Sequence, residues 1–253
     1  MAEYDIADRL TQGLRGAVML LTRLPLPASP RPPAGPSAAW AWPLAGIIVA
    51  GLAAVAAAVA LWAGVPAGPA AALALAVQIM ATGAMHEDGL ADTADGFWGG
   101  WTRERRLEIM KDSRIGSYGV LALVIVGLMR WSALAHAFDA GWVVAPLIAS
   151  AALSRVPMAA LMAGLPNARG TGLSQSLGRP SGAVAAKAAG VATLAALAFA
   201  GWGAVPMALA VAAVALAVAA LARAKIGGQT GDVLGAAQQL AEAASLAVFC
   251  ALI

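Results

Sequence analysis

Long runs of Ala, Leu and Val, separated by short polar segments, form the main pattern along this chain. A helix needs about 20 mostly apolar residues to cross a bilayer, and runs of about this length recur. The pattern predicts about seven spans, at residues 41–62, 70–85, 118–137, 142–163, 183–201, 204–221 and 233–253. The last predicted span is the least apolar, because Gln238, Gln239 and Glu242 give it a polar stripe.

The segment before the first span has a different pattern. Residues 1–24 place apolar side chains at helical spacing, among them Leu10, Leu14 and Leu21, which is typical of an amphipathic helix on a membrane surface. Residues 25–39 are rich in proline and predict a non-helical linker. We therefore expect one all-α domain over residues 1–253, a polytopic membrane bundle.

Composition supports this class. Hydrophobic residues make up 61% of the chain, charged residues only 11%, and the mean hydropathy is +0.79. A soluble domain has about 45–50% apolar and about 25% charged residues, so an ordinary soluble domain is excluded. The expected partner is the lipid bilayer, and no nucleic-acid partner is expected. Small residues allow close helix packing within or between chains, so the oligomeric state stays open.

Cysteine content and the N-terminus add two further expectations. The single cysteine, Cys250, excludes a disulfide framework and fits a small apolar residue in the last helix. The chain opens with acidic residues and a short apolar run, which does not fit a signal peptide.

Basic residues alternate between loops, which indicates the orientation of the spans. The loops expected to be cytoplasmic carry Arg9, Arg15, Arg23, Arg31, Arg103, Arg105, Arg106, Lys111, Arg114, Arg169, Arg179, Lys187, Arg223 and Lys225. The intervening loops GVPAGP, FDAG and GWGAVP have none. This alternation supports seven spans and places a loop with both acidic and basic residues, 86–117, in the cytoplasm.

The segment HEDGLADTADGFWGG places four acidic residues directly after an apolar run. On a helix of about 100° per residue, Asp92 and Asp95 lie within about 40° of Asp88, so three carboxylates share one face. Glu87 points about 100° away, and His86 about 160° away, which favours a supporting or structural role for His86. A solvated acidic loop would have no reason to show this shared face.

Three unpaired carboxylates on one face repel one another, and a divalent cation removes that conflict. Oxygen ligands without His or Cys suit Mg²⁺, Mn²⁺ or Ca²⁺. The spacing therefore predicts a metal site formed by Asp88, Asp92 and Asp95. Gly89 and Gly96 would leave the backbone open for a bulky ligand beside this site.

A basic segment, WTRERRLEIMKDSRIGSYG, follows. Lys111 and Arg114 flank Asp112, and a cationic cluster beside a metal is typical of phosphoryl transfer, where it neutralises charge on phosphate oxygens. The same two cations could instead be positive-inside residues. That second interpretation is preferred for Arg103 and Arg106.

Two further segments carry candidate residues. KIGGQTGDVLGAAQQLAE has three glycines that could form an anion-binding nest, followed by Asp232, which could instead be a helix N-cap. The loop GLPNARGTGLSQSLGRPSG presents Arg169. Arg155 lies within the fourth predicted span, and a membrane-buried arginine usually marks a site. Arg130 has a similar place in the third span, although its side chain could simply snorkel.

Together, HEDGLADTADG, RRLEIMKDSRIGSYG and GGQTGDVLGA, with Glu242 downstream, resemble the cobalamin synthase (adenosylcobinamide-GDP ribazoletransferase) family. The motifs occur in the family's order at the cytoplasmic ends of spans, and RLPLP and WPLAG near the first span also fit. The resemblance covers nearly the whole chain, and only the NARGTG loop matches more loosely.

The resemblance implies a multispan bacterial inner-membrane enzyme that needs Mg²⁺, and the loop charges place its active site on the cytoplasmic side. It implies transfer of adenosylcobinamide phosphate from adenosylcobinamide-GDP to α-ribazole or its 5′-phosphate, with release of GMP, which completes adenosylcobalamin. Under this hypothesis Asp88, Asp92 and Asp95 hold one or two Mg²⁺ ions, with Asp112 or Asp232 as a candidate further ligand. The phosphate-binding cations are Lys111, Arg114, Arg155 and Arg169. One carboxylate, Asp112 or Asp232, accepts the proton of the attacking hydroxyl.

Two other classes share part of the pattern. CDP-alcohol phosphotransferases are membrane enzymes with clustered aspartates, and Asp92-x-x-Asp95-Gly96 matches the opening of their DxxDGxxAR motif. Gly99 and Gly100 stand where Ala-Arg is required, and the second half of that motif is also missing. A transporter would place its charged residues near the middle of discontinuous helices, whereas these acids cluster at one membrane face.

Overall fold

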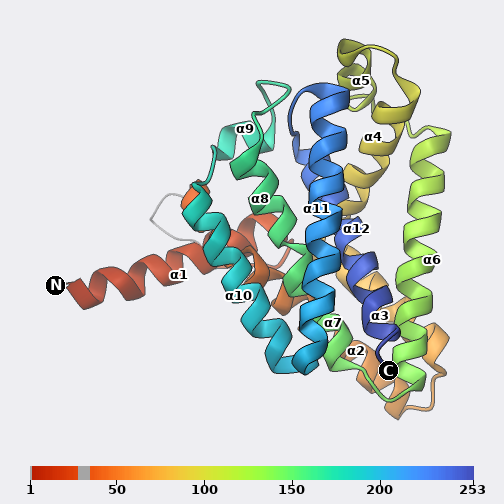
Figure 1. Ribbon diagram of the computed structural model, residues 1–253. Coiled ribbons are helices and arrows are strands. Elements are labelled where there is room, and N and C mark those ends of the chain that lie inside the picture. The colour runs from red at the N-terminus through yellow and green to blue at the C-terminus, as the bar shows by residue number, and fades with distance from the viewer. Residues whose placement is uncertain (1, 28–34) are drawn as a thin grey trace.

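Helices form nearly all the regular structure of the residues that the computed structural model describes, 2–27 and 35–253. The N-terminal half contains α1 (Ala2–Leu21), η1 (Pro36–Ala41), α2 (Trp42–Trp62), α3 (Ala67–Thr82), α4 (Met85–Gly99) and α5 (Arg103–Ile109). The remainder contains α6 (Ser117–Asp139), α7 (Val144–Ser154), α8 (Val156–Gly164), α9 (Leu173–Leu177), α10 (Gly182–Ala200), η2 (Gly201–Gly203), α11 (Ala204–Ile226) and α12 (Gly231–Cys250). Figure 1 shows the longer helices as a bundle from which α1 projects, which confirms the predicted all-α membrane class.

The number of spans differs from the prediction. Within the described ranges, five helical segments are long and apolar enough to cross a membrane, or six if the bent pair α3–α4 is one span. One of the five, Gly182–Ile226, is 45 residues long and contains both α10 and α11. A single helix of that length would measure about 68 Å, more than twice the bilayer core, and Figure 1 shows the chain reversing between the two helices. The predicted count of seven is not confirmed.

A sharp bend separates α3 from α4. The two helices meet at 89°, and Gly83 and Ala84 between them have left-handed φ values of 67° and 57°. Glycine adopts this conformation without a steric penalty, which explains its place at the end of α3. Because the chain turns here, residues 86–99 of the predicted cytoplasmic loop continue as a helix, and half of that helix is buried in the bundle.

The centre of the bundle consists of α7 and α12. Every side chain of α7 except Val144 is buried, and α12 packs against α4, α6, α7 and α11. The break between α7 and α8 falls at Arg155, two residues before Pro157 in the first turn of α8, where a proline is tolerated because its missing N–H has no helical partner. The predicted span 142–163 is therefore two helices in sequence.

Small residues set the close spacing of these helices. A Cβ at Gly46 of α2 would lie 2.6 Å from the carbonyl oxygen of Ala151 in α7, so only glycine allows this approach. The buried core between α2, α3 and α7 is dominated by alanine. Membrane helices associate in this way because small side chains let their backbones come close together.

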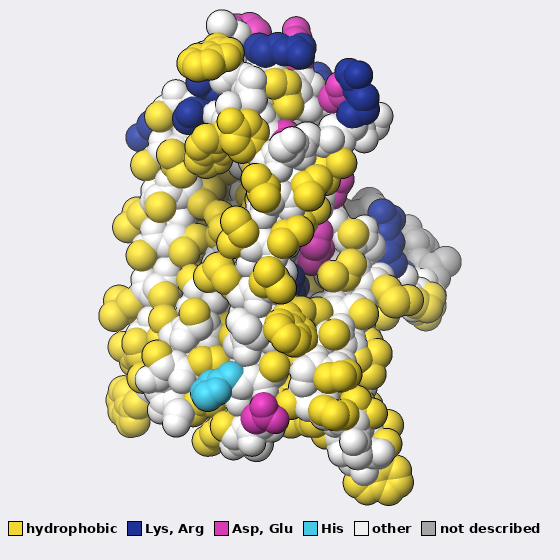
Figure 2. Space-filling view, turned by 90° about the vertical axis from the view of Figure 1, so that its right-hand side faces the viewer, with side chains coloured by type: hydrophobic (Ala, Val, Ile, Leu, Met, Phe, Trp, Pro, Cys, Tyr) yellow, Lys and Arg dark blue, Asp and Glu magenta, His cyan; other side chains and the backbone are white. Residues whose placement is uncertain are grey.

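The outer helices present apolar side chains to their surroundings. Leu121, Ile125 and Leu128 of α6 and Leu216 of α11 are exposed. Figure 2 shows hydrophobic side chains over most of one face, with the largest group of Lys, Arg, Asp and Glu side chains at one end. An apolar belt next to a charged end is the surface expected of a protein that lies in a bilayer.

The N-terminal segment agrees with the prediction in part. Residues 2–21 form a helix that buries Ala17, Val18 and Leu21 against the bundle and leaves Leu10 exposed. Residues 28–34 of the predicted linker, with Arg31, lie outside the described residues. The last part of that linker, residues 36–39, belongs to the 3-10 helix η1 instead of an irregular chain.

Candidate active site

The first turn of α12 lies directly against α4. A Cβ at Gly89 would come within 2.7 Å of the carbonyl oxygen of Asp232, and a Cβ at Gly235 would lie 3.2 Å from the Cα of His86. The two glycines therefore let the backbones meet, and this contact brings Asp232 beside the acidic face of α4. The space predicted for a ligand at Gly89 is thus filled by α12, and the space at Gly96 is filled by Met110.

Asp88, Asp92 and Asp232 form an acidic cluster at this contact. Asp92 is half-buried, and the negative charges of Asp88, Asp232 and Asp95 all act on it, opposed by Arg169. Asp88 is exposed. Within residues 35–253, neither Asp88 nor Asp92 has a hydrogen bond or ion pair through its carboxylate. Both groups are therefore free to bind a cation or a substrate.

Arg169 is the cation of this cluster. Its Nη2 lies 2.9 Å from Oδ2 of Asp232 and 3.4 Å from the carbonyl oxygen of Met110. The hydroxyl of Thr230 donates a second hydrogen bond to the Asp232 carboxylate, at 3.2 Å, and also caps α12 by accepting from the N–H of Val233. The sequence thus predicted correctly that a helix begins at Asp232, but the N-cap is Thr230.

Backbone hydrogen bonds between the loop after α8 and the loop before α12 hold Arg169 in place. The N–H of Ala168 donates to the carbonyl oxygen of Gln229, and the N–H of Gln229 donates to that of Pro166, both at 2.8 Å. Gly228 packs against the Pro166 backbone, and Gly227 ends α11 with a φ of 75°. Gly227 therefore serves helix termination and Gly228 serves close packing, two roles that their spacing did not indicate.

Asp95 makes contacts that the sequence did not predict. Its side chain is only 7% exposed, and its two oxygens accept hydrogen bonds from the N–H groups of Gly116 and Gly119, at 2.7 and 2.9 Å. Gly116 is the N-cap residue of α6 and Gly119 lies in its first turn, so Asp95 caps that helix from outside it. Among the described residues, no group of three His, Cys, Asp or Glu side chains could hold a metal ion. Asp88, Asp92 and Asp95 as a set of metal ligands stay a prediction, with Asp95 directed at the backbone of α6 in this structure.

Asp112 and Arg114 lie on the surface between α5 and α6. Nη2 of Arg114 is 2.7 Å from Oδ2 of Asp112, and the Arg114 side chain is highly exposed. The hydrogen bonds from Arg114 lower the pKa of Asp112, which makes this carboxylate a weaker base. Lys111 is exposed beside them. These three residues form a charged rim to the site, apart from the acidic cluster.

Arg103 and Arg106 have structural partners that their positive-inside interpretation did not include. Nε of Arg103 donates to the carbonyl oxygen of Ile226, at 2.8 Å, and Nη1 of Arg106 donates to that of Lys225, at 3.0 Å. The last carbonyls of a helix have no helical partners, so these arginines cap α11 and attach α5 to it.

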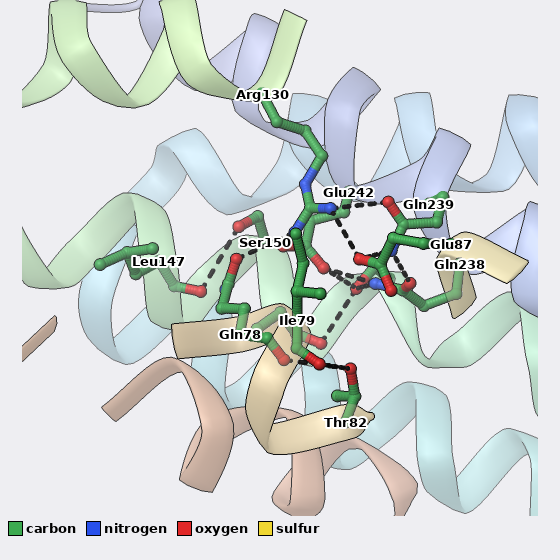
Figure 3. A network of polar contacts seen from close by, with 12 residues as sticks. Gln78, Ile79, Thr82, Glu87, Arg130, Leu147, Ser150, Gln238, Gln239 and Glu242 are labelled. Carbon is green, nitrogen blue, oxygen red and sulfur yellow. Dashed lines mark hydrogen bonds and ion pairs between the residues drawn. The ribbon is translucent and has the colours of Figure 1, made fainter. Parts of the chain in front are cut away.

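A second group of charges is buried deeper in the bundle. Arg130 of α6 lies 2.9 Å from Glu242 of α12 and 3.3 Å from Glu87 of α4, and it donates hydrogen bonds to Gln239 at 2.6 Å and Gln78 at 2.9 Å. Figure 3 shows these side chains converging from separate helices. Arg130 therefore does not snorkel, and Glu87, which the helical-face argument set aside, belongs to this network.

Arg155 belongs to the same network. Its Nη1 lies 2.8 Å from Oε2 of Glu242, and both residues are almost completely buried, at 3% and 1% exposed. Ser154 and Gln238 also bond to that Glu242 oxygen. The guanidinium that was predicted to hold phosphate is thus neutralised inside the bundle. The polar stripe of the last span was the signal that could have located its partner.

Fold and site together define a class: a polytopic helical membrane protein with carboxylates and cations gathered at one end of the bundle. The chain belongs to the cobalamin-5-phosphate synthase family, whose family model matches residues 13–250.

Curated relatives extend over nearly the whole chain. It is similar to an adenosylcobinamide-GDP ribazoletransferase of Mesorhizobium japonicum, with 43% identity over 232 residues, covering 91% of this chain and 90% of the relative. A relative of the same name from Bradyrhizobium diazoefficiens is 45% identical over 242 residues, covering 94% and 93%. A third, from Azorhizobium caulinodans, is 44% identical over 253 residues, covering 94% and 95%. No solved structure matches.

Proposed function

We propose that the chain is an adenosylcobinamide-GDP ribazoletransferase. In this reaction a hydroxyl of α-ribazole, or of its 5′-phosphate, attacks the phosphorus on the cobinamide side of the diphosphate. A new P–O bond forms, the bond to GMP breaks, and the hydroxyl proton passes to a base. The observation that carries the proposal is the contact between α4 and α12, which places Asp232 beside Asp88 and Asp92 in a member of this family.

Asp232 is the better candidate for the base. It lies in the acidic cluster, where Arg169 and Thr230 fix the orientation of its carboxylate. A general base must lie within hydrogen-bond reach of the proton that it accepts. Asp112 is instead paired with Arg114 at the exposed rim, so we assign Lys111 and Arg114 to contacts with substrate phosphates and Asp112 to the orientation of Arg114.

Asp88 and Asp92 fit a Mg²⁺ ion. Both are oxygen donors without a protein partner in the described ranges, and Mg²⁺ is usually held by one or two carboxylates together with substrate phosphates and water. When bound, Mg²⁺ would neutralise charge on the diphosphate and on the departing GMP. The protein's own contribution is to hold two carboxylates on one helix face opposite Asp232.

Location follows from the distribution of charge. Arg169 bonds to Asp232 of the acidic cluster, Arg103 and Arg106 bond to the end of α11 that precedes it, and loops rich in Lys and Arg face the cytoplasm. We therefore place the site on the cytoplasmic side of a bacterial inner membrane. At this face a soluble nucleotide-linked substrate can reach the cluster.

A direct assay tests the proposal. The protein purified in detergent is supplied with adenosylcobinamide-GDP, α-ribazole and Mg²⁺, and release of GMP is followed, with a CDP-alcohol as the alternative donor. We expect GMP release that stops on chelation and returns with Mg²⁺. Asp92→Ala should abolish it, whereas Asp139→Ala, at the opposite end of α6, should leave it unchanged. No GMP above a protein-free control would overturn the proposal, and release of CMP would favour the phosphotransferase class.

A further inference from the structure

An apolar pocket beside the acidic cluster is not used by the chemistry described above. Its walls come from α1, α2, α4, α8, α9 and α12, and include Trp42, Met162, Leu177 and Leu234. Two polar side chains reach it, His86 and Ser174. The Ser174 hydroxyl already accepts a hydrogen bond from Asn167, at 2.9 Å. The pocket is therefore suited to a mostly hydrophobic group.

His86 is the unusual member of this wall. Its side chain is 1% exposed, and within residues 35–253 neither Nδ1 nor Nε2 has a hydrogen-bond partner. A neutral imidazole has one donor and one acceptor, and buried groups of this kind are normally paired. An unpaired imidazole at the surface of a pocket indicates that a ligand supplies the missing partner.

The pocket and the carboxylates are neighbours along two helices. Gly231 lines the pocket, and the next residue is Asp232. On α4, Met85 also lines the pocket and precedes Asp88 by three residues, which is about 60° and about 4.5 Å along the helix. A nucleoside whose base occupied the pocket would therefore hold its ribose close to the acidic cluster.

We propose that this pocket binds the base of the ribazole acceptor, an inference that rests on the proposed function. The base of α-ribazole is dimethylbenzimidazole, a flat and mostly apolar bicycle with one unsubstituted ring nitrogen. The imidazole of His86 donates a hydrogen bond to that nitrogen, and the apolar walls cover the methyl-bearing ring. Guanine carries several polar groups that these walls would leave unpaired, so the pocket also distinguishes the acceptor from the GMP part of the donor.

Steady-state kinetics test the role of His86. His86→Leu keeps the apolar volume and removes the donor, so the KM for α-ribazole should rise about tenfold. The KM for adenosylcobinamide-GDP should not change. His86→Gln keeps an N–H donor and should restore part of the affinity. Free dimethylbenzimidazole should inhibit competitively against α-ribazole, and more weakly in His86→Leu.

Calorimetric binding of free dimethylbenzimidazole separates this proposal from the proposed function, because it needs no turnover. Leu177→Phe should fill the pocket and weaken binding, whereas Leu194→Phe, on the exposed face of α10, is the matched control and should not. If neither His86→Leu nor Leu177→Phe changes this binding, the assignment of the pocket to the ribazole base is overturned, even if GMP is released. If His86→Leu lowers the Tm and leaves the KM for α-ribazole unchanged, the imidazole is structural and the proposal is also overturned.

Discussion

Nη2 of Arg169 lies 2.9 Å from Oδ2 of Asp232, and this ion pair joins the loop after α8 to the first turn of α12. The pair is partly shielded, with side-chain exposures of 13% and 21%. It sits where α12 meets the carboxylates of α4. Its position distinguishes Asp232 from Asp112, the other carboxylate that the sequence offered as a base.

Replacement of these two carboxylates should have very different effects on catalysis. Asp232→Asn should lower kcat about 10²- to 10⁴-fold, the usual contribution of a general base. Asp112→Asn should change kcat by less than about threefold and leave the Tm nearly unchanged, because an exposed ion pair contributes little stability. Both variants are compared by GMP release and thermal unfolding in detergent.

The pH profile provides a check on the same assignment. Arg114 lowers the pKa of Asp112, so that carboxylate stays ionised until the pH falls below its ordinary value. Its charge does not change near neutral pH. Any change of activity with pH near 7 should therefore persist in Asp112→Asn. If the change of activity with pH near 7 disappears in Asp112→Asn, Asp112 is the base.

Glu242 should be a main determinant of stability. Glu242→Gln would leave the cations of Arg130 and Arg155 buried with only Glu87 to balance them, and breaking a buried pair costs about 3–5 kcal/mol. The measurement is the thermal unfolding temperature in detergent. The matched control is Glu108→Gln, which removes an exposed pair with Arg105 and should cost less than about 1 kcal/mol. Equal shifts in the two variants would refute a dominant role for the network.

Asp95 and Asp92 should separate stability from activity. Asp95→Asn removes the charge that caps α6 and should destabilise the protein by about 1–3 kcal/mol, with little change in the Mg²⁺ concentration required for activity. Asp92→Asn should raise the Mg²⁺ concentration required for activity and leave the Tm nearly unchanged. If Asp95→Asn instead raises the Mg²⁺ requirement and keeps the Tm of the parent protein, Asp95 is a metal ligand after all.

Gly89 should tolerate no side chain. In Gly89→Ala the new methyl group would meet the Asp232 backbone, and overpacking of this kind costs about 1–3 kcal/mol. Because the same contact positions Asp232, kcat should fall as well. Gly190→Ala, in α10 with open space around it, is the control and should be neutral or slightly stabilising. Full activity in Gly89→Ala would show that the α4–α12 contact does not position the base.

Much of the local structure follows from the sequence. Apolar runs predicted the helices, the helical period of about 3.6 residues predicted that Asp88 and Asp92 share a face of one helix, and the motif RRLEIMKDSRIGSYG with its neighbours indicated the family. These features depend on residues that are close along the chain, where helical geometry fixes their relative positions.

The tertiary structure decided which helix faces met. Arg155, a predicted phosphate ligand, bonds to Glu242, which lies 87 residues away along the chain. Asp95, a predicted metal ligand, accepts hydrogen bonds from the N-terminal end of α6. Helical periodicity gives the direction of a side chain around its own axis, but it does not say which helix packs on that side. In an alanine-rich bundle, that choice depends on where glycines such as Gly46, Gly89 and Gly235 allow two backbones to approach, and this contact brings Asp232 to the acidic face of α4.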